Sequence, residues 1–233
     1  MEWTNRAEIT PQSGYVTCIR FSPDNTRVAL CTTTGHIEIR NPIDLSELVT
    51  KQVHTKSVNE IRWSEDSTLL LSCSDDGTLV LSQSSDLVKL QQFKGHHSYI
   101  LTCDISSTNL RIVSGSYDES VRIWDTSTGK CLKFISAHSE PVSSVSYSKD
   151  SKFIISSSWD GICRLWDSFS GTCVKSFEVC RVPISFSILS PNDQFFLASS
   201  NNSIIKLIRI SDAKTVAIYR GHQNNQFGLF GSF

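Results

Sequence analysis

The chain has 233 residues, enough for one all-β domain. Its 22 basic and 23 acidic residues give a net charge of −1, which excludes a whole-chain attraction to nucleic acid or to an anionic membrane. Apolar runs such as Phe153-Ile154-Ile155 have the length of a strand and are too short to cross a bilayer. Met1 to Arg6 lack the basic and then apolar profile of a signal peptide, so we expect a protein that is not secreted.

A repeat of 42 residues organises the chain. His54, His96 and His138 stand one repeat apart, and Trp124-Asp125 recurs as Trp166-Asp167. A period of 40 to 45 residues with Gly-His and Trp-Asp signatures is typical of WD-repeat β-propellers. We therefore predict an all-β WD40 propeller with five complete four-stranded blades and one strand of a sixth.

The domain boundaries follow from the same period. An N-terminal strand is expected within residues 1–11, followed by one propeller domain over residues 12–233. Its repeats are expected near 12–53, 54–95, 96–137, 138–179 and 180–221, with a partial repeat over 222–233.

The fourth repeat shows how one repeat makes one blade. Pro141–Tyr147 alternates apolar and small polar residues, which suits an inner strand, and Phe153–Ser157 is the second strand. Trp159-Asp160-Gly161 is a tight hairpin, with a glycine free to take positive φ. Ile162–Trp166 is the third strand and Cys173–Phe177 the outer fourth, so four antiparallel strands make the blade.

The periodic polar residues are predicted to form a buried hydrogen-bonded tetrad, in which Asp accepts from His, His bonds a Ser hydroxyl, and that hydroxyl bonds the Trp indole. The tetrads are His96, Ser114, Asp118 and Trp124 in the third repeat, and His138, Ser156, Asp160 and Trp166 in the fourth. A Ser/His/Asp trio also suits a hydrolase, but its recurrence at the repeat period favours a structural role.

The tetrad decays toward both ends of the chain. The second repeat keeps its His, Ser and Asp, and the first and fifth repeats are expected to rest on apolar packing alone and to be less rigid. The replacements are Ser82 in the second repeat, Gln12 and Thr34 in the first, and Cys180, Ala198, Asn202 and Ile208 in the fifth.

Eight cysteines carry neither a CxxC pair nor a Cys/His ligand spacing, so a zinc site is not expected. Buried, reduced thiols of a cytosolic or nuclear protein are the better interpretation.

Five repeats and a partial sixth leave the expected ring open. Propellers usually close on themselves, because closure hides the edges of their strands. The chain ends at Gly231-Ser232-Phe233, within an expected strand, so the sequence favours a truncated gene or gene model over a natural five-bladed ring.

Four segments carry a more specific resemblance: Val113–Asp125, Thr128–Lys133, Ala137–Ser143 and Asp160–Asp167. They resemble the WD-repeat core subunits of COMPASS-type histone lysine methyltransferase complexes, which have seven blades. The resemblance extends over essentially the whole chain and is weakest at both ends. It implies a non-catalytic subunit of a multiprotein complex that works in the nucleus, although no basic cluster of the importing kind is present in the sequence.

The resemblance also implies a binding site. In that family the central channel accepts an arginine of a methyltransferase subunit or histone tail between two aromatic rings. One ring position falls on Phe230 and the other on Leu101, which is not aromatic. Further channel positions fall on Thr17, Thr33, Asn59, Asp75, Tyr117, Pro141, Ser143, Trp159, Ser185, Phe227 and Gly228. Without the resemblance, the sequence pattern favours ordinary strand residues, such as a core Phe230 and a first-strand Ser143, and the resemblance makes the two interpretations about equal. A second family surface, for an acidic-hydrophobic peptide, maps near Asn192, Phe195 and Leu207.

Four functions compete at this point. We expect an adaptor that binds an Arg-containing peptide in a chromatin-modifying complex. The alternatives are a WD scaffold of another assembly, such as ubiquitin ligation, RNA processing or signalling, and a non-functional truncated copy. An enzyme is not expected, and neither are a cofactor and a metal, because the sequence has no Gly-rich phosphate loop, metal-ligand cluster or exposed nucleophile.

Overall fold

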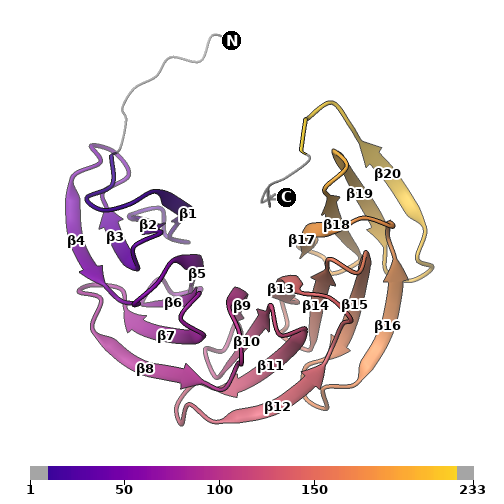
Figure 1. Cartoon of the computed structure of the whole chain (residues 1–233), viewed down its shortest axis with the longest axis horizontal. Coiled ribbons are helices and arrows are strands. Elements are labelled where there is room, and N and C mark those ends of the chain that lie inside the picture. The colour runs from indigo at the N-terminus through magenta and orange to yellow at the C-terminus, as the bar shows by residue number, and fades with distance from the viewer. Residues whose placement is uncertain (1–9, 225–233) are drawn as a thin grey trace.

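The computed structural model describes residues 10–224, which fold into five antiparallel sheets of four strands each. The sheets stand around a common axis as an open arc, with the first strand of each sheet innermost and the fourth on the outside (Figure 1). The all-β propeller architecture predicted from the repeat is thereby confirmed, and each sheet is one blade. The N-terminal strand expected within residues 1–11 lies outside the described residues except for Thr10 and Pro11, and residues 225–233 of the expected partial repeat also lie outside them.

The blades follow one another in chain order. Blade 1 contains β1 (Val16–Phe21), β2 (Val28–Thr32), β3 (His36–Arg40) and β4 (Glu47–Gln52). Blade 2 contains β5 (Val58–Trp63), β6 (Leu69–Ser74), β7 (Thr78–Gln83) and β8 (Lys89–Lys94). Blade 3 contains β9 (Ile100–Ile105), β10 (Arg111–Ser116), β11 (Ser120–Asp125) and β12 (Cys131–Ser136). Blade 4 contains β13 (Val142–Tyr147), β14 (Phe153–Ser158), β15 (Ile162–Asp167) and β16 (Cys173–Glu178). Blade 5 contains β17 (Ile184–Leu189), β18 (Phe195–Ser200), β19 (Ile204–Arg209) and β20 (Thr215–Tyr219).

The apolar core lies between blades rather than at one centre. Val113 and Val121 of blade 3, for example, share one buried cluster with Val145 and Ile154 of blade 4. Each middle strand alternates its side chains between two neighbouring sheets, so both faces of an internal blade are buried. Among residues 10–224 no helix is long and apolar enough to span a membrane.

A glycine with positive φ lies where blade 4 is tied to blade 5. Gly161, in the β14–β15 hairpin, has a φ of 80°, and its carbonyl accepts the N–H groups of Val179 (3.1 Å) and Cys180 (3.2 Å). A Cβ at this position would collide with the Cys180 carbonyl oxygen. The small turn residue therefore lets the chain entering blade 5 lie directly on the hairpin of blade 4.

A buried carboxylate joins the inner strands of the first blades. Glu60 on β5 is fully buried, and its Oε1 lies 3.3 Å from Arg20 Nη2 on β1 and 2.8 Å from Arg62 Nη2. Its Oε2 accepts hydrogen bonds from the Thr102 hydroxyl (2.8 Å) and the Cys103 N–H (3.3 Å) on β9. Two cations and two further donors compensate the burial of this charge, so Glu60 ties three blades together.

Blade 1 corrects one expectation. It does not rest on apolar packing alone, because Glu38 is fully buried and lies 2.6 Å from Arg40 Nη2. The backbone N–H of Gln12 donates to Glu38 Oε1 at 2.7 Å. The Glu38 carboxylate on β3 thus supplies polar interactions to blade 1. They could not be predicted from the tetrad positions, because residue 38 is not one of them.

Candidate functional site: the inner rim of the propeller

Three rows of repeat-equivalent residues surround the inner side of the arc at one end of the inner strands. We call them the rim, entry and wall rows. The rim row lies at the turn after the second strand of each blade and comprises Thr33, Asp75, Tyr117, Trp159 and Asn201. The entry row directly precedes each inner strand and comprises Tyr15, Ser57, Tyr99, Pro141 and Pro183. The wall row is the second residue of each inner strand and comprises Thr17, Asn59, Leu101, Ser143 and Ser185.

Backbone hydrogen bonds fix the rim row against the entry row in every blade. The rim N–H donates to the entry carbonyl of the same blade, as from Tyr117 to Tyr99 at 2.9 Å and from Trp159 to Pro141 at 3.1 Å. The other three bonds run from Thr33 to Tyr15 (2.9 Å), from Asp75 to Ser57 (3.0 Å) and from Asn201 to Pro183 (3.0 Å). The backbone is therefore uniform, and the side chain at each position decides what each blade offers.

Aromatic rings gather where blades 3 and 4 meet. The Tyr117 ring lies edge-on to Tyr99, with centroids 6.1 Å apart, and to Trp159, at 5.7 Å and 90°. All three remain well exposed, at 46% for Tyr99, 45% for Tyr117 and 39% for Trp159. Large exposed rings in contiguous positions are uncommon on a surface without a partner, so this aromatic rim is a candidate binding surface.

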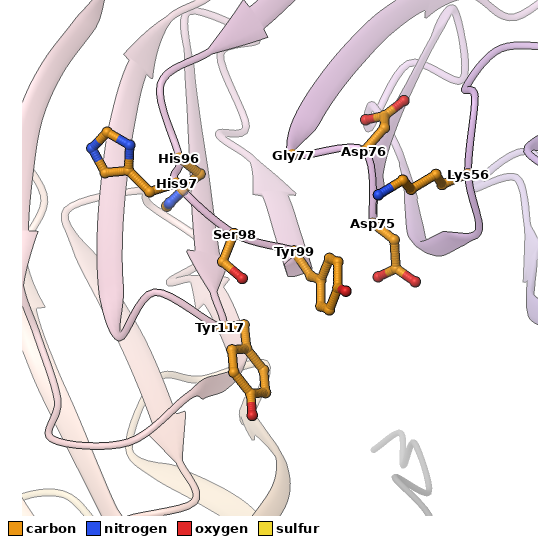
Figure 2. Close-up of a pocket in the computed structure, with 9 residues that line it drawn as sticks. All are labelled: Lys56, Asp75, Asp76, Gly77, His96, His97, Ser98, Tyr99 and Tyr117. Atoms are coloured by element: carbon orange, nitrogen blue, oxygen red, sulfur yellow. The ribbon is translucent and has the colours of Figure 1, made fainter.

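A charged pocket opens beside the aromatic rim. A cavity of about 530 Å³ lies between blades 2 and 3, and Figure 2 shows Asp75 and Lys56 on one side of it, with Tyr99 and Tyr117 along the other. Asp75 Oδ1 accepts a hydrogen bond from Asn59 Nδ2 at 2.7 Å, and Lys56 Nζ lies 5.8 Å from the centroid of the Tyr99 ring. The carboxylate and the ring faces together are the two chemical features that recognise a cation.

The polar side chains of the wall row have a structural role. Its polar side chains donate to carbonyls of the next inner strand: Thr17 to Val58 (2.5 Å), Asn59 to Ile100 (2.9 Å) and Ser143 to Ile184 (2.6 Å). Leu101 cannot form the corresponding bond, and Ser185 instead donates to Ser199 within its own blade at 3.1 Å. Thr17, Asn59 and Ser143 therefore join neighbouring blades, and Leu101 interrupts that series.

The structure brings only some of the predicted channel residues together. Asp75, Tyr117 and Trp159 lie on neighbouring blades, with Asn59 bonded to Asp75, whereas Thr33 lies on blade 1, at the far end of the arc from blade 5 (Figure 1). Pro141 is buried, and its carbonyl is engaged by Trp159. Phe227, Gly228 and Phe230 lie outside the described residues.

Sequence reasoning missed Tyr99 and Lys56 at this site. The signal for Tyr99 was present, because residue 99 stands one repeat before Pro141, which the family resemblance places at the channel. Lys56 had no such signal, since its side chain reaches the Tyr99 ring from the preceding blade.

The tetrads of blades 3 and 4 are formed by hydrogen bonds in the order expected. His96 Nδ1 lies 2.9 Å from Asp118 Oδ2, His96 Nε2 lies 2.7 Å from Ser114 Oγ, and Trp124 Nε1 donates to that oxygen at 2.9 Å. The corresponding distances in blade 4, among His138, Asp160, Ser156 and Trp166, are 2.9, 2.8 and 2.8 Å. These side chains are occupied with one another, which argues against a catalytic role for them.

Blade 4 differs in one partner of its tetrad. In blade 3 the Ser120 hydroxyl donates to Asp118 at 2.5 Å and lies 3.3 Å from His96 Nδ1. The equivalent residue in blade 4 is Ile162, and the Arg164 guanidinium takes its place, 3.1 Å from Asp160 Oδ2 and 2.6 Å from His138 Nδ1. A cation in blade 4 therefore does what a hydroxyl does in blade 3.

The second family surface falls on blade 5. Asn192, in the β17–β18 turn, accepts hydrogen bonds from Ser190 Oγ (2.7 Å) and the Gln194 N–H (3.2 Å). The Phe195 ring lies 5.9 Å from the Arg209 guanidinium, and Leu207 pairs with Leu197 across β18 and β19. The Asn192 side chain therefore stabilises the turn in which it lies.

Radial four-stranded blades with rims of repeat-equivalent residues define a β-propeller repeat protein, a class that generally provides non-catalytic surfaces for protein–protein interaction. Residues 3–39, 46–81, 87–125 and 129–167 match the WD40 family (WD domain, G-beta repeat). The chain belongs to the WD40 family. Strand β16 and the whole of blade 5, in which the tetrad is lost, lie beyond the matched residues. No curated protein matches the chain.

Proposed function

We propose that this WD40 chain is a scaffold that binds an arginine side chain of a partner peptide at the inner rim of blades 2 to 4. The observation that carries the proposal is the aromatic rim of Tyr99, Tyr117 and Trp159 beside the Asp75 carboxylate. A guanidinium on an aromatic face contributes about 0.5 to 2 kcal/mol, and a carboxylate adds a charge-assisted hydrogen bond.

Arginine suits this site better than lysine. Its planar guanidinium stacks on a ring and still donates in its own plane, whereas an ammonium acts as a point charge. Lys56 already places an ammonium 5.8 Å from the Tyr99 ring, and the site retains exposed aromatic surface on Tyr117 and Trp159. Residue 101 is leucine where the family has an aromatic ring. We therefore expect the arginine of the peptide to contact the rim row rather than the wall row.

We further propose that the scaffold works in a histone methyltransferase complex in the nucleus. The support is the resemblance of the segments Val113–Asp125, Thr128–Lys133, Ala137–Ser143 and Asp160–Asp167 to the WD-repeat core subunits of such complexes. The partner would then be an Arg-containing peptide of a methyltransferase subunit or a histone tail.

Titration of a fluorescent Arg-containing peptide tests the site. Tyr117→Ala and Asp75→Asn should each weaken binding about tenfold, because each removes one of the two features that recognise the cation. Lys56→Met should strengthen binding, since it removes a competing ammonium. Replacing the peptide arginine with citrulline, which is planar but uncharged, should abolish binding.

Tyr219→Ala is the matched control, because Tyr219 is a comparably exposed tyrosine on the outer strand β20. Equal affinities for wild type, Tyr117→Ala and Asp75→Asn would refute the rim site. Phe230→Ala tests the ring position carried over from the family. The chain can also be used as bait to purify its complexes. If these complexes lack a methyltransferase while the rim still binds arginine, only the assignment to the methyltransferase complex is refuted.

A further inference from the structure

The junction between the outer strands of blades 3 and 4 differs from its neighbour. A cavity of about 200 Å³ lies there, which we call the outer notch, and it is lined by Arg111, Ile123, Leu132, Lys133, Ser168 and Phe169. Leu132 is 44% exposed and Phe169 is 74% exposed, so both offer apolar surface to solvent. The repeat-equivalent residues of Phe169 in blades 3 and 5 are Ser127 and Ser211.

The next junction fills the corresponding place with a lysine. Between blades 4 and 5, Lys175 Nζ donates to the carbonyls of Ile210 (2.7 Å) and Ser211 (2.8 Å). Lys133 is the repeat equivalent of Lys175, but at its junction Arg111 Nη1 donates to the Ser168 carbonyl at 3.2 Å. Arg111 thus takes the place of the lysine, and the Lys133 side chain remains at the notch.

The notch is cationic as well as apolar. Two cations and no acidic residue line it, and the Arg111 guanidinium lies 5.2 Å from the Phe169 ring centroid. Neither Arg111 nor Lys133 forms an ion pair within residues 10–224. Uncompensated cations beside exposed apolar groups fit a partner that brings carboxylates together with an aliphatic side chain.

The notch adjoins an open strand edge. β12 is the outermost strand of blade 3, pairs only with β11, and lies on the convex side of the arc (Figure 1). Its outer row of N–H and C=O groups is available to an added strand, and five of its six residues are exposed. An extended peptide that pairs there gains main-chain hydrogen bonds and places alternate side chains on the notch side.

We propose that the β12 edge and the outer notch bind an extended acidic peptide of a partner protein by strand addition. The peptide adds a fifth strand to blade 3, places an aliphatic side chain against Leu132 and Phe169, and directs carboxylates toward Arg111 and Lys133. This surface is separate from the inner rim, so the two binding functions are independent.

A panel of short fluorescent peptides tests this proposal by fluorescence polarisation. Each peptide alternates glutamate with leucine, isoleucine, valine or phenylalanine, and a matched panel replaces glutamate with lysine. The acidic panel should contain a binder, and the lysine panel should contain none. A proline at the centre of the binder should abolish binding, because it removes a main-chain donor.

Variants of the chain locate the binding. Lys133→Glu and Leu132→Ala should each weaken it about tenfold or more. The controls are Lys94→Glu, on the outer strand of blade 2, and Val174→Ala, the repeat equivalent of Leu132, and both should bind as wild type. Circular dichroism verifies that every variant is folded.

Three results would overturn the proposal. The first is the absence of a binder in the acidic panel at millimolar concentration. The second is equal binding by Lys133→Glu and wild type. The third is self-association of the chain that Lys133→Glu abolishes while no peptide competes, because the occupant would then be a second copy.

Discussion

Blades 4 and 5 stand side by side but hold their hairpins in different ways. In blade 4, His138 from the segment before β13 bonds Asp160 in the β14–β15 hairpin, and Trp166 completes the set through Ser156. In blade 5, Cys180 replaces the histidine, and its thiol donates to the Val182 carbonyl, two residues further along the same segment. The side-chain connection that His138 and Asp160 make between segment and hairpin has no counterpart at Cys180 and Asn202 in the described part of blade 5.

Apolar packing takes over in blade 5. Ile208 stands at the tryptophan position, is 3% exposed, and shares a buried cluster with Phe177 and Phe196, whose rings lie 4.9 Å apart. A lysine also ties the entering segment to β19, since Lys206 Nζ donates to the Val179 carbonyl at 2.5 Å. Packing and one lysine keep the blade folded, but they constrain the entering segment less than a closed hydrogen-bonded set does. The same fold is therefore compatible with unequal local stability.

The largest expected effect is the loss of the histidine itself. His138→Ala leaves Asp160 and Ser156 without their imidazole partner and should lower the free energy of unfolding by about 2 to 4 kcal/mol. Cys180→Ala removes a single weak thiol contact and should cost less than about 1 kcal/mol. Urea denaturation of both variants measures the difference, and equal losses would show that the tetrad has no special role.

Acid should reduce the difference between the two blades. Burial lowers the pKa of His138 in spite of Asp160. Burial alone would raise the pKa of Asp160, but the hydrogen bond and charge of His138 outweigh it, and the pKa is lowered. Both groups bind protons less readily in the folded state. Their stabilisation is therefore present at neutral pH and is lost as pH falls, below about 6.5 for the histidine and below about 4 for the aspartate.

Blade 5 has Cys180 and Asn202 in place of this histidine and aspartate. Amide exchange of β13–β15, corrected for the intrinsic pH dependence, should therefore become faster between pH 7 and pH 5 relative to β17–β19. A constant ratio between the two blades would contradict this assignment.

Blade 2 provides the smallest effect and separates the tryptophan from the rest of the tetrad. Ser82 stands at the tryptophan position, and its buried hydroxyl has no hydrogen-bond partner within the described residues. Ser72 still bonds His54 at 2.8 Å and turns to the Val80 carbonyl at 3.3 Å. Ser82→Ala should raise the free energy of unfolding by about 0.5 kcal/mol, because it removes a buried unpaired hydroxyl, and thermal denaturation measures the gain. A destabilised variant would reveal a hidden partner of Ser82.

Much of this organisation could be predicted from the sequence. The 42-residue step predicted the propeller architecture, and few folds other than a propeller repeat His, Ser, Asp and Trp at that spacing. The substitution of Arg164 for the blade 3 hydroxyl could not be foreseen, because it depends on a long side chain reaching across its own blade. The network of Glu60 was missed for a related reason. Arg20 and Arg62 stand one repeat apart, but the repeat equivalents of Glu60 are Cys18 and Thr102, so no repeat of residue type marks the carboxylate that they contact.

The inner rim was only partly foreseen. Tyr117 and Trp159 follow from the family resemblance, and their edge contact follows from adjacent positions in neighbouring blades. The wall row is also compatible with ordinary strand residues. The interblade hydrogen bonds of Thr17, Asn59 and Ser143 support that interpretation, because they give these side chains a structural role. A sequence pattern cannot distinguish a hydroxyl that joins two blades from one that awaits a ligand.

Native-state hydrogen exchange at neutral pH tests the central claim most directly, namely that the tetrads set local rigidity in an otherwise uniform propeller. The amides of β9–β11 and β13–β15 should show the highest protection. Those of β17–β19 should exchange through local openings of lower free energy. Equal protection of blade 5 and blades 3 and 4 would show that apolar packing alone rigidifies a blade and would contradict the account.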